Sequence, residues 1–216
     1  TNTFPNWRLA QPFRMICHNG EINTLSGNAQ RMRARQAKLA CPLLGNDLKD
    51  LFPILQPGGS DSAWFDNVLE LLVRAGRTLP HALMMTIPEA FGPSYHMSTD
   101  KRAFYEYHAA IMEPWDGPAA ILMTDGILVG GTLDRNGLRP ARYIVTTDGL
   151  LVLGSEVGVI SFPPEAIEQK GRLQPGRMLL VDTLEGRIVQ DNEIKGKIAR
   201  RRPYRRWLEQ NRLTLP

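Results

Sequence analysis

The chain has 216 residues, a mass of 24.2 kDa and 43% apolar residues, which exclude collagens, coiled coils and wholly disordered chains. It contains no run of 18 apolar residues, so a membrane-spanning helix is not expected. Two cysteines, Cys17 and Cys41, are too few for a disulfide framework, and a reducing, cytoplasmic setting is the default expectation. A chain that starts at Thr1 is either processed or an internal piece of a longer one.

Positive charge is concentrated near the C-terminal end. Lys and Arg number 26 against 22 Asp and Glu, and seven of the twelve residues from Lys195 to Arg206 are basic. Nucleic acid is one class of partner for such a stretch, but no aromatic platform or nucleic-acid motif accompanies it. We therefore favour a basic connector over residues 195–216, leading to another part of a larger polypeptide.

Helical periodicity dominates the first half of the chain. The apolar residues 13–17 indicate a short strand that ends in the tight turn Asn19-Gly20. The best-defined helix covers residues 61–75, because apolar residues recur there at i, i+3, i+4 and i+7 and Gly76 follows. The other helices are expected at 28–39, 80–90 and 99–112.

Strand patterns replace helical ones after Gly117. Asp-Gly dipeptides and a Leu-Glu-Gly turn separate three pairs of apolar runs, which predict three β-hairpins. The expected strand pairs are 119–124 with 127–133, 143–147 with 150–154, and 178–183 with 187–190, and a helix is expected at 204–211. Helices followed by antiparallel strands predict an α+β fold, with residues 1–194 as the main domain.

Two segments carry residue types suited to chemistry. Asn19 and Gly20 would bring a side-chain amide and a backbone N–H to one place, as an oxyanion requires, although most Asn-Gly pairs are simple turns. Asp61 would either stabilise the helix N-terminus or bind a cation such as an α-ammonium group. The segment 134–140 combines one carboxylate with two guanidinium groups, which suits either a plain loop or a polar network behind a site.

The sequence gives weaker support to any candidate nucleophile. An N-terminal threonine such as Thr1 can use its own amine as a base. Cys17 and His18 are adjacent on a strand and would point to opposite faces, so a catalytic pair is not expected. His18 and Glu21 are too few ligands for a metal site.

Several ordered motifs match one family over essentially the whole chain. They are residues 1–5, 9–14, 18–23, 61–62, 112–118, 134–140, 155–158 and 171–176. In this order they resemble the later part of the N-terminal class II glutamine amidotransferase domain of glutamate synthases. The resemblance implies an N-terminal-nucleophile hydrolase fold, an α-β-β-α sandwich with two antiparallel sheets, here without its opening part.

The resemblance also implies an activity. In the family an N-terminal cysteine attacks the side-chain amide of glutamine, and the released ammonia serves reductive amination of 2-oxoglutarate to glutamate. FMN and an iron–sulfur cluster support that second reaction, and neither is expected to bind within this segment. Partners implied are glutamine, the rest of the large subunit and a small NAD(P)H-oxidising subunit, with no membrane.

Site residues are carried over motif by motif. Asn19 and Gly20 would form the oxyanion hole, Asp61 would hold the α-ammonium group of glutamine, and Thr1 and Asn2 would line the glutamine pocket. The nucleophilic cysteine and the arginine that binds the substrate carboxylate would both precede Thr1. We therefore expect a fragment that is inactive on its own, and the alternative is a non-catalytic glutamine-binding module.

Overall fold

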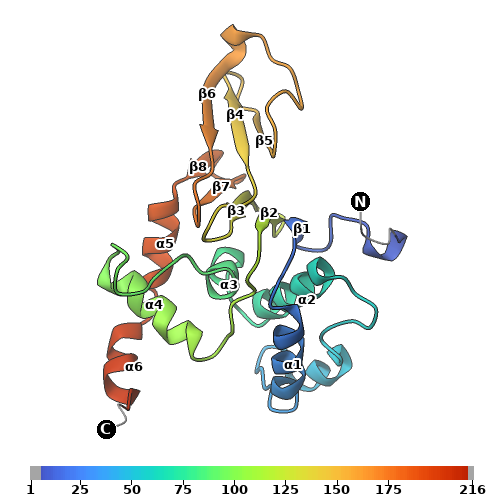
Figure 1. Ribbon diagram of the computed structural model, residues 1–216, viewed down its shortest axis with the longest axis vertical. Helices are drawn as coiled ribbons and strands as arrows, with labels where there is room; N and C mark the ends of the chain where they lie inside the picture. Colours follow the sequence, from blue (N-terminus) through green and yellow to red (C-terminus); the bar gives the residue numbers. More distant parts are fainter. Residues whose placement is uncertain (1–5, 214–216) are drawn as a thin grey trace.

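The computed structural model describes residues 6–213, which form two sheets and a group of helices (Figure 1). Helices cover one face of a five-stranded sheet, and a three-stranded sheet packs against part of the other face. Figure 1 shows the three-stranded sheet extending as an arm at the end of the molecule opposite α6. The predicted α+β class with antiparallel sheets is confirmed.

Both sheets are antiparallel throughout. The larger one has the order β1 (Ile16–Gly20), β2 (Ala119–Thr124), β3 (Leu128–Leu133), β7 (Met178–Asp182) and β8 (Arg187–Val189). The smaller one has the order β5 (Leu151–Gly154), β4 (Arg142–Thr146) and β6 (Ile167–Arg172). The pairs β2–β3, β4–β5 and β7–β8 are the three predicted hairpins, which are confirmed.

Six α-helices are present in residues 6–213. They are α1 (Leu25–Gln36), α2 (Asp61–Arg74), α3 (Leu79–Thr86), α4 (Thr99–Ala109), α5 (Asp191–Ala199) and α6 (Tyr204–Asn211). The expected helix 80–90 ends early, because Ile87 precedes Pro88 and a residue before proline disfavours helical backbone. None of these helices has the length and apolar character needed to cross a membrane.

The main core lies between the helices and the larger sheet. On β2, Ala119, Ile121 and Met123 point into it, and α2 contributes its fully buried apolar stripe. A smaller core on the opposite face joins the two sheets and contains Leu133, Ala141, Leu173 and Leu179. The larger sheet is thus fixed on both faces.

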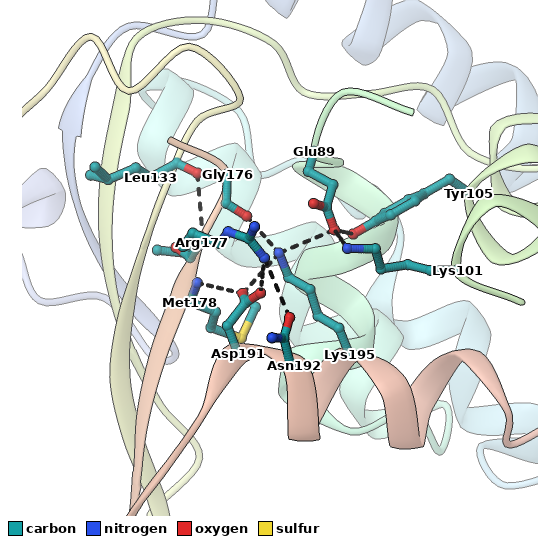
Figure 2. Close-up of polar contacts among 11 residues, drawn as sticks. Glu89, Lys101, Tyr105, Leu133, Gly176, Arg177, Met178, Asp191, Asn192 and Lys195 are labelled. Atoms are coloured by element: carbon teal, nitrogen blue, oxygen red, sulfur yellow. Dashed lines mark hydrogen bonds and ion pairs between the residues drawn. The ribbon is translucent and has the colours of Figure 1, made fainter. Parts of the chain in front are cut away.

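A buried polar network attaches α5 to the rest of the fold (Figure 2). Lys195, only 3% exposed, donates from Nζ to Gly176 O at 2.5 Å and pairs with Asp191 Oδ1 at 2.9 Å and Glu89 Oε1 at 3.3 Å. The expected boundary between residues 194 and 195 therefore falls inside a packed helix rather than after it. That the basic stretch leads to a further domain stays a prediction.

Candidate active site

The open edge of β1 is the first feature of the candidate site. Met15 O accepts a hydrogen bond from Thr124 N at 2.9 Å, and Glu21 N donates to Pro118 O at 3.0 Å. The backbone N–H and C=O groups of the odd-numbered residues from 15 to 21 therefore point towards β2. In an antiparallel ladder the backbone groups of the residues between them point to the opposite side. The backbone N–H of Gly20 consequently points to the edge of the sheet.

Most backbone groups at this edge are already satisfied by partners outside any strand. Ile16 N donates to Asp66 Oδ1 at 3.1 Å. His18 N donates to Gln11 Oε1 at 2.5 Å, and Gln11 Nε2 donates back to His18 O at 2.9 Å. The next N–H along the edge belongs to Gly20, and it has no hydrogen-bond partner among residues 6–213.

The glycine at position 20 is required by close packing. A Cβ atom there would lie 1.8 Å from Pro118 O and 2.8 Å from His18 Nε2, distances that no side chain tolerates. Asn19 is exposed, and its side-chain amide makes no hydrogen bond within the described part of the chain. The last two residues of β1 thus offer an exposed side-chain amide and a backbone N–H at the sheet edge. That they act together on one oxyanion stays a prediction.

Asp61 lies at the same end of β1. It is the first residue of α2, and its Oδ2 accepts from Ile22 N at 2.9 Å, two residues beyond Gly20. Its Oδ1 accepts from Ser62 N at 2.7 Å. The side chain is half-buried. A carboxylate oxygen can accept two hydrogen bonds, and Oδ2 accepts only one from residues 6–213, so Asp61 retains capacity for a cation.

Residues 112–118 hold the turn that follows Gly20. Asn23 N donates to Asp116 O at 2.7 Å, and Asp116 N donates to Thr24 Oγ1 at 3.0 Å. Asn28 Nδ2 donates to Pro114 O at 2.9 Å from the first turn of α1. Three hydrogen bonds between residues 23–28 and residues 112–118 therefore fix the backbone just after the candidate site.

The segment 134–140 is a largely exposed loop with one buried carboxylate, and no hydrogen bond joins that carboxylate to either guanidinium group among residues 6–213. Asp134 is 4% exposed and accepts from Ala119 N at 2.9 Å and from Asn136 N at 3.0 Å. Arg135 forms an ion pair with Asp116. Arg139 has its Nε enclosed without a hydrogen-bond partner in residues 6–213. This loop supports the start of β2, directly beside Gly20.

Neither Cys17 nor His18 has the properties of a catalytic base or nucleophile. They lie on opposite faces of β1, with His18 buried and Cys17 half-buried. Burial raises the pKa of the Cys17 thiol, and the charge of Asp66 raises it further, so the thiol stays protonated. Burial lowers the pKa of His18, which the charge of Asp61 partly opposes.

Some expected residues fall outside the described part of the chain, and others were missed. Thr1 and Asn2 lie outside residues 6–213. Gln11 and Asp66 were not singled out by the sequence, although both hold β1. The sequence held one indication for each. Gln11 lies inside the motif 9–14, and Asp66 is a carboxylate on the apolar side of a predicted helix. Within residues 6–213 no cluster of three or more His, Cys, Asp or Glu residues could hold a metal ion.

The model of the family described as "Glutamine amidotransferases class-II" matches residues 1–207. The chain therefore belongs to the class II glutamine amidotransferases. A solved structure of a glutamine phosphoribosylpyrophosphate amidotransferase from Bacillus subtilis aligns with a TM-score of 0.45 at 18% identity, covering 86% of this chain and 32% of that one.

Within that family the chain is similar to glutamate synthases. It is 54% identical over 210 residues to the large chain of the NADPH glutamate synthase of Bacillus subtilis, covering 97% of this chain and 14% of the relative. It is 49% identical over 217 residues to the ferredoxin-dependent glutamate synthase of Cyanidium caldarium, covering 100% of this chain and 14% of that one. The chain thus spans about one seventh of the length of these relatives.

Proposed function

We propose that this chain supplies the oxyanion-binding and ammonium-binding parts of a site that hydrolyses the side-chain amide of glutamine. Asn19 and Gly20 donate to the amide oxygen, and Asp61 binds the α-ammonium group. Thr1 and Asn2 line the same pocket. The observation that carries the proposal is the Gly20 N–H, which faces the sheet edge without a partner in residues 6–213 while its neighbours on that edge are satisfied.

The chemistry follows from where charge develops. Attack of a thiolate on the amide carbon places a negative charge on the oxygen of a tetrahedral intermediate. Donors that are fixed before the reaction stabilise this charge without reorganising, and removal of one such donor costs about 100- to 1,000-fold in kcat. Gly20 is held by the β1–β2 ladder, so its N–H meets this condition.

The nucleophile is proposed to lie outside these 216 residues. Burial raises the pKa of the Cys17 thiol and keeps it protonated, and Cys41 belongs to none of the motifs that match the family. The 216 residues alone are therefore proposed to be inactive. Support for a longer polypeptide comes from the relatives, of which this chain covers 14%.

In that longer polypeptide, the ammonia would be used to convert 2-oxoglutarate into glutamate. A small NAD(P)H-oxidising subunit is a proposed partner. FMN and the iron–sulfur cluster are proposed to bind elsewhere, because such clusters are usually held by four ligands, mostly cysteine thiolates, and the chain has two cysteines. The proposed setting is the cytoplasm.

The test is glutamine hydrolysis by the full-length polypeptide and by residues 1–216 alone. Asn19→Ala is expected to lower kcat about 100-fold with little change in KM, since the lost donor acts in the transition state. Asn136→Ala is the matched control, because it alters another exposed asparagine followed by glycine whose side chain has no hydrogen bond in residues 6–213.

Two results would contradict the proposal. One is equal kinetics for Asn19→Ala and Asn136→Ala, which would show that the Asn19 amide does not contact the oxyanion. The other is steady release of glutamate by residues 1–216 alone, which would place a nucleophile within them. Asp61→Asn is expected to raise KM for glutamine at least 10-fold, and an unchanged KM would exclude its role in binding the ammonium group.

A further inference from the structure

A buried side-chain contact joins β1 to the N-terminus of α2. His18 Nδ1 and Ser62 Oγ are 2.8 Å apart, and both residues are 6% exposed. The contact bridges two segments separated by 44 residues in the sequence. Neither side chain has a part in the amide hydrolysis as derived above.

The two ends of this contact lie beside the two halves of the candidate site. Ser62 directly follows Asp61, and both its N–H and its hydroxyl donate to Asp61 Oδ1, at 2.7 Å and 3.3 Å. His18 directly precedes Asn19 and Gly20. The position of the carboxylate relative to the edge N–H therefore depends on how firmly His18 and Ser62 are held together.

The Ser62 hydroxyl lies between the imidazole and the carboxylate. It is 2.8 Å from His18 Nδ1 and 3.3 Å from Asp61 Oδ1. Burial lowers the pKa of His18, which favours the neutral ring in this contact. A chain of two hydrogen bonds thus runs from the β1 side chain to the Asp61 carboxylate.

The same ring also supports Gly20 from behind. A Cβ on Gly20 would meet His18 Nε2 at 2.8 Å, so the imidazole occupies the space next to the Gly20 backbone. This Nε2 is buried without a hydrogen-bond partner in residues 6–213. His18 thus contacts the surroundings of the edge N–H and, through Ser62, the carboxylate.

We propose that His18 is a positioning residue that sets the spacing between the Gly20 N–H and the Asp61 carboxylate. The inference rests on the proposed function. The three-carbon chain of glutamine limits the distances that its amide oxygen and its α-ammonium group can span, and a bound conformer has one of them. It engages both groups together only when they are correctly spaced. Misplacement by about 1 Å can cost about 100-fold in rate. The His18–Ser62 contact thereby favours substrates that carry an α-ammonium group.

The test compares two substrates in the full-length polypeptide: L-glutamine, and glutaramate, which has the same amide but no α-ammonium group. Ser62→Ala and His18→Leu are expected to lower kcat/KM for glutamine about 10- to 100-fold. For glutaramate we expect Ser62→Ala to cost about threefold or less, because that substrate does not use Asp61 and does not depend on the spacing. His18→Leu also removes the ring beside the Gly20 backbone, so its loss with glutaramate is expected to be larger, but smaller than its loss with glutamine.

Conservative variants serve as matched controls. Ser62→Thr keeps the hydroxyl and is expected to retain glutamine kinetics within about threefold. His18→Asn places an amide nitrogen near the position of Nδ1 and is expected to recover part of the loss. The double variant His18→Leu/Ser62→Ala should lose no more than the worse single variant, since both remove the same contact.

Equal losses with glutamine and glutaramate would overturn the inference, because they would assign His18 a purely structural role. Fully additive losses in the double variant would also overturn it. Asp61→Asn separates this failure from that of the proposed function. If that variant leaves the preference for glutamine over glutaramate unchanged, the ammonium-binding role itself is wrong. Thermal unfolding midpoints identify variants that lose activity by failing to fold.

Discussion

Replacing Lys195 with methionine removes the central cation of the buried network that attaches α5 (Figure 2). Its ammonium group loses Gly176 O at 2.5 Å, Asp191 Oδ1 at 2.9 Å and Glu89 Oε1 at 3.3 Å. Breaking a buried ion pair by deleting one partner costs about 3–5 kcal/mol, since the remaining charge stays buried. The loss here is expected at the lower end, about 3 kcal/mol.

The lower end applies because both carboxylates keep other partners. Asp191 still pairs with Arg177 at 2.8 Å, and Glu89 still pairs with Lys101 at 3.0 Å. Methionine also fills much of the space of the lysine stem, which limits the loss of packing. In a domain of this size, 3 kcal/mol corresponds to a fall of about 6–12 °C in Tm.

Urea unfolding followed by circular dichroism measures the change. Lys197→Met is the matched control, because Lys197 is exposed on the same helix and makes no ion pair within residues 6–213. Its free energy of unfolding is expected to change by about 0.5 kcal/mol or less. Equal effects of the two substitutions would refute the reasoning and would return the C-terminal stretch to the status of a loosely attached connector.

Two further predictions concern pH and packing. Burial lowers the pKa of His81 to about 3 and that of His108 to about 4, from 6.5, so only the unfolded chain binds protons there between pH 7 and pH 5. The free energy of unfolding should therefore fall by about 2 kcal/mol per histidine over this interval, and His81→Leu should remove about half of that dependence in urea titrations. No change between pH 7 and pH 5 would contradict this. Gly117→Ala places a Cβ 1.8 Å from Glu21 O and should lower the free energy of unfolding by about 2–3 kcal/mol. Gly27 lies on α1 with open space around it, so Gly27→Ala should raise the free energy of unfolding by about 0.5–1 kcal/mol. Similar melting curves for these two variants would show that the turn after Gly20 relaxes freely.

The elements that sequence patterns predicted well are those with strong local signals. Asp125-Gly126 and Asp148-Gly149 located two hairpins, because their glycines adopt positive φ in tight turns. The helix α2 was found from its apolar stripe and from Gly76 beyond its end. These signals depend on a few neighbouring residues, so no tertiary information was needed.

The elements that were missed depend on distant contacts. The strand β6 has the sequence IEQKGR and lies at the edge of the smaller sheet, so exposure removes the alternation of apolar and polar residues. The basic residues around Lys195 suggested a solvated connector, and only the folded chain brings Glu89 and Asp191 to that lysine. The charge of a lysine in the sequence does not show whether its ion-pair partners lie within the same fold or elsewhere.

The candidate site also combines residues that local motifs predicted with residues that depend on distant contacts. Asn19, Gly20 and Asp61 were named from their motifs, and the structure places Gly20 and Asp61 at one end of β1. The residues that hold β1 at this end, such as Gln11 and Ser62, act across many positions in the chain. Side chains whose partner is a distant backbone group or another side chain leave no periodic signal in the sequence.

The Gln11 amide has a consequence for the behaviour of the chain in concentrated solution. A free sheet edge is a template on which a strand from another molecule can pair, and short edges are blocked in many proteins by local devices. Gln11 occupies both the donor and the acceptor of His18, and Asp66 occupies the N–H of Ile16, so most of this edge is closed to a foreign strand. The same device that leaves Gly20 available to a small ligand therefore protects the molecule against edge-to-edge association.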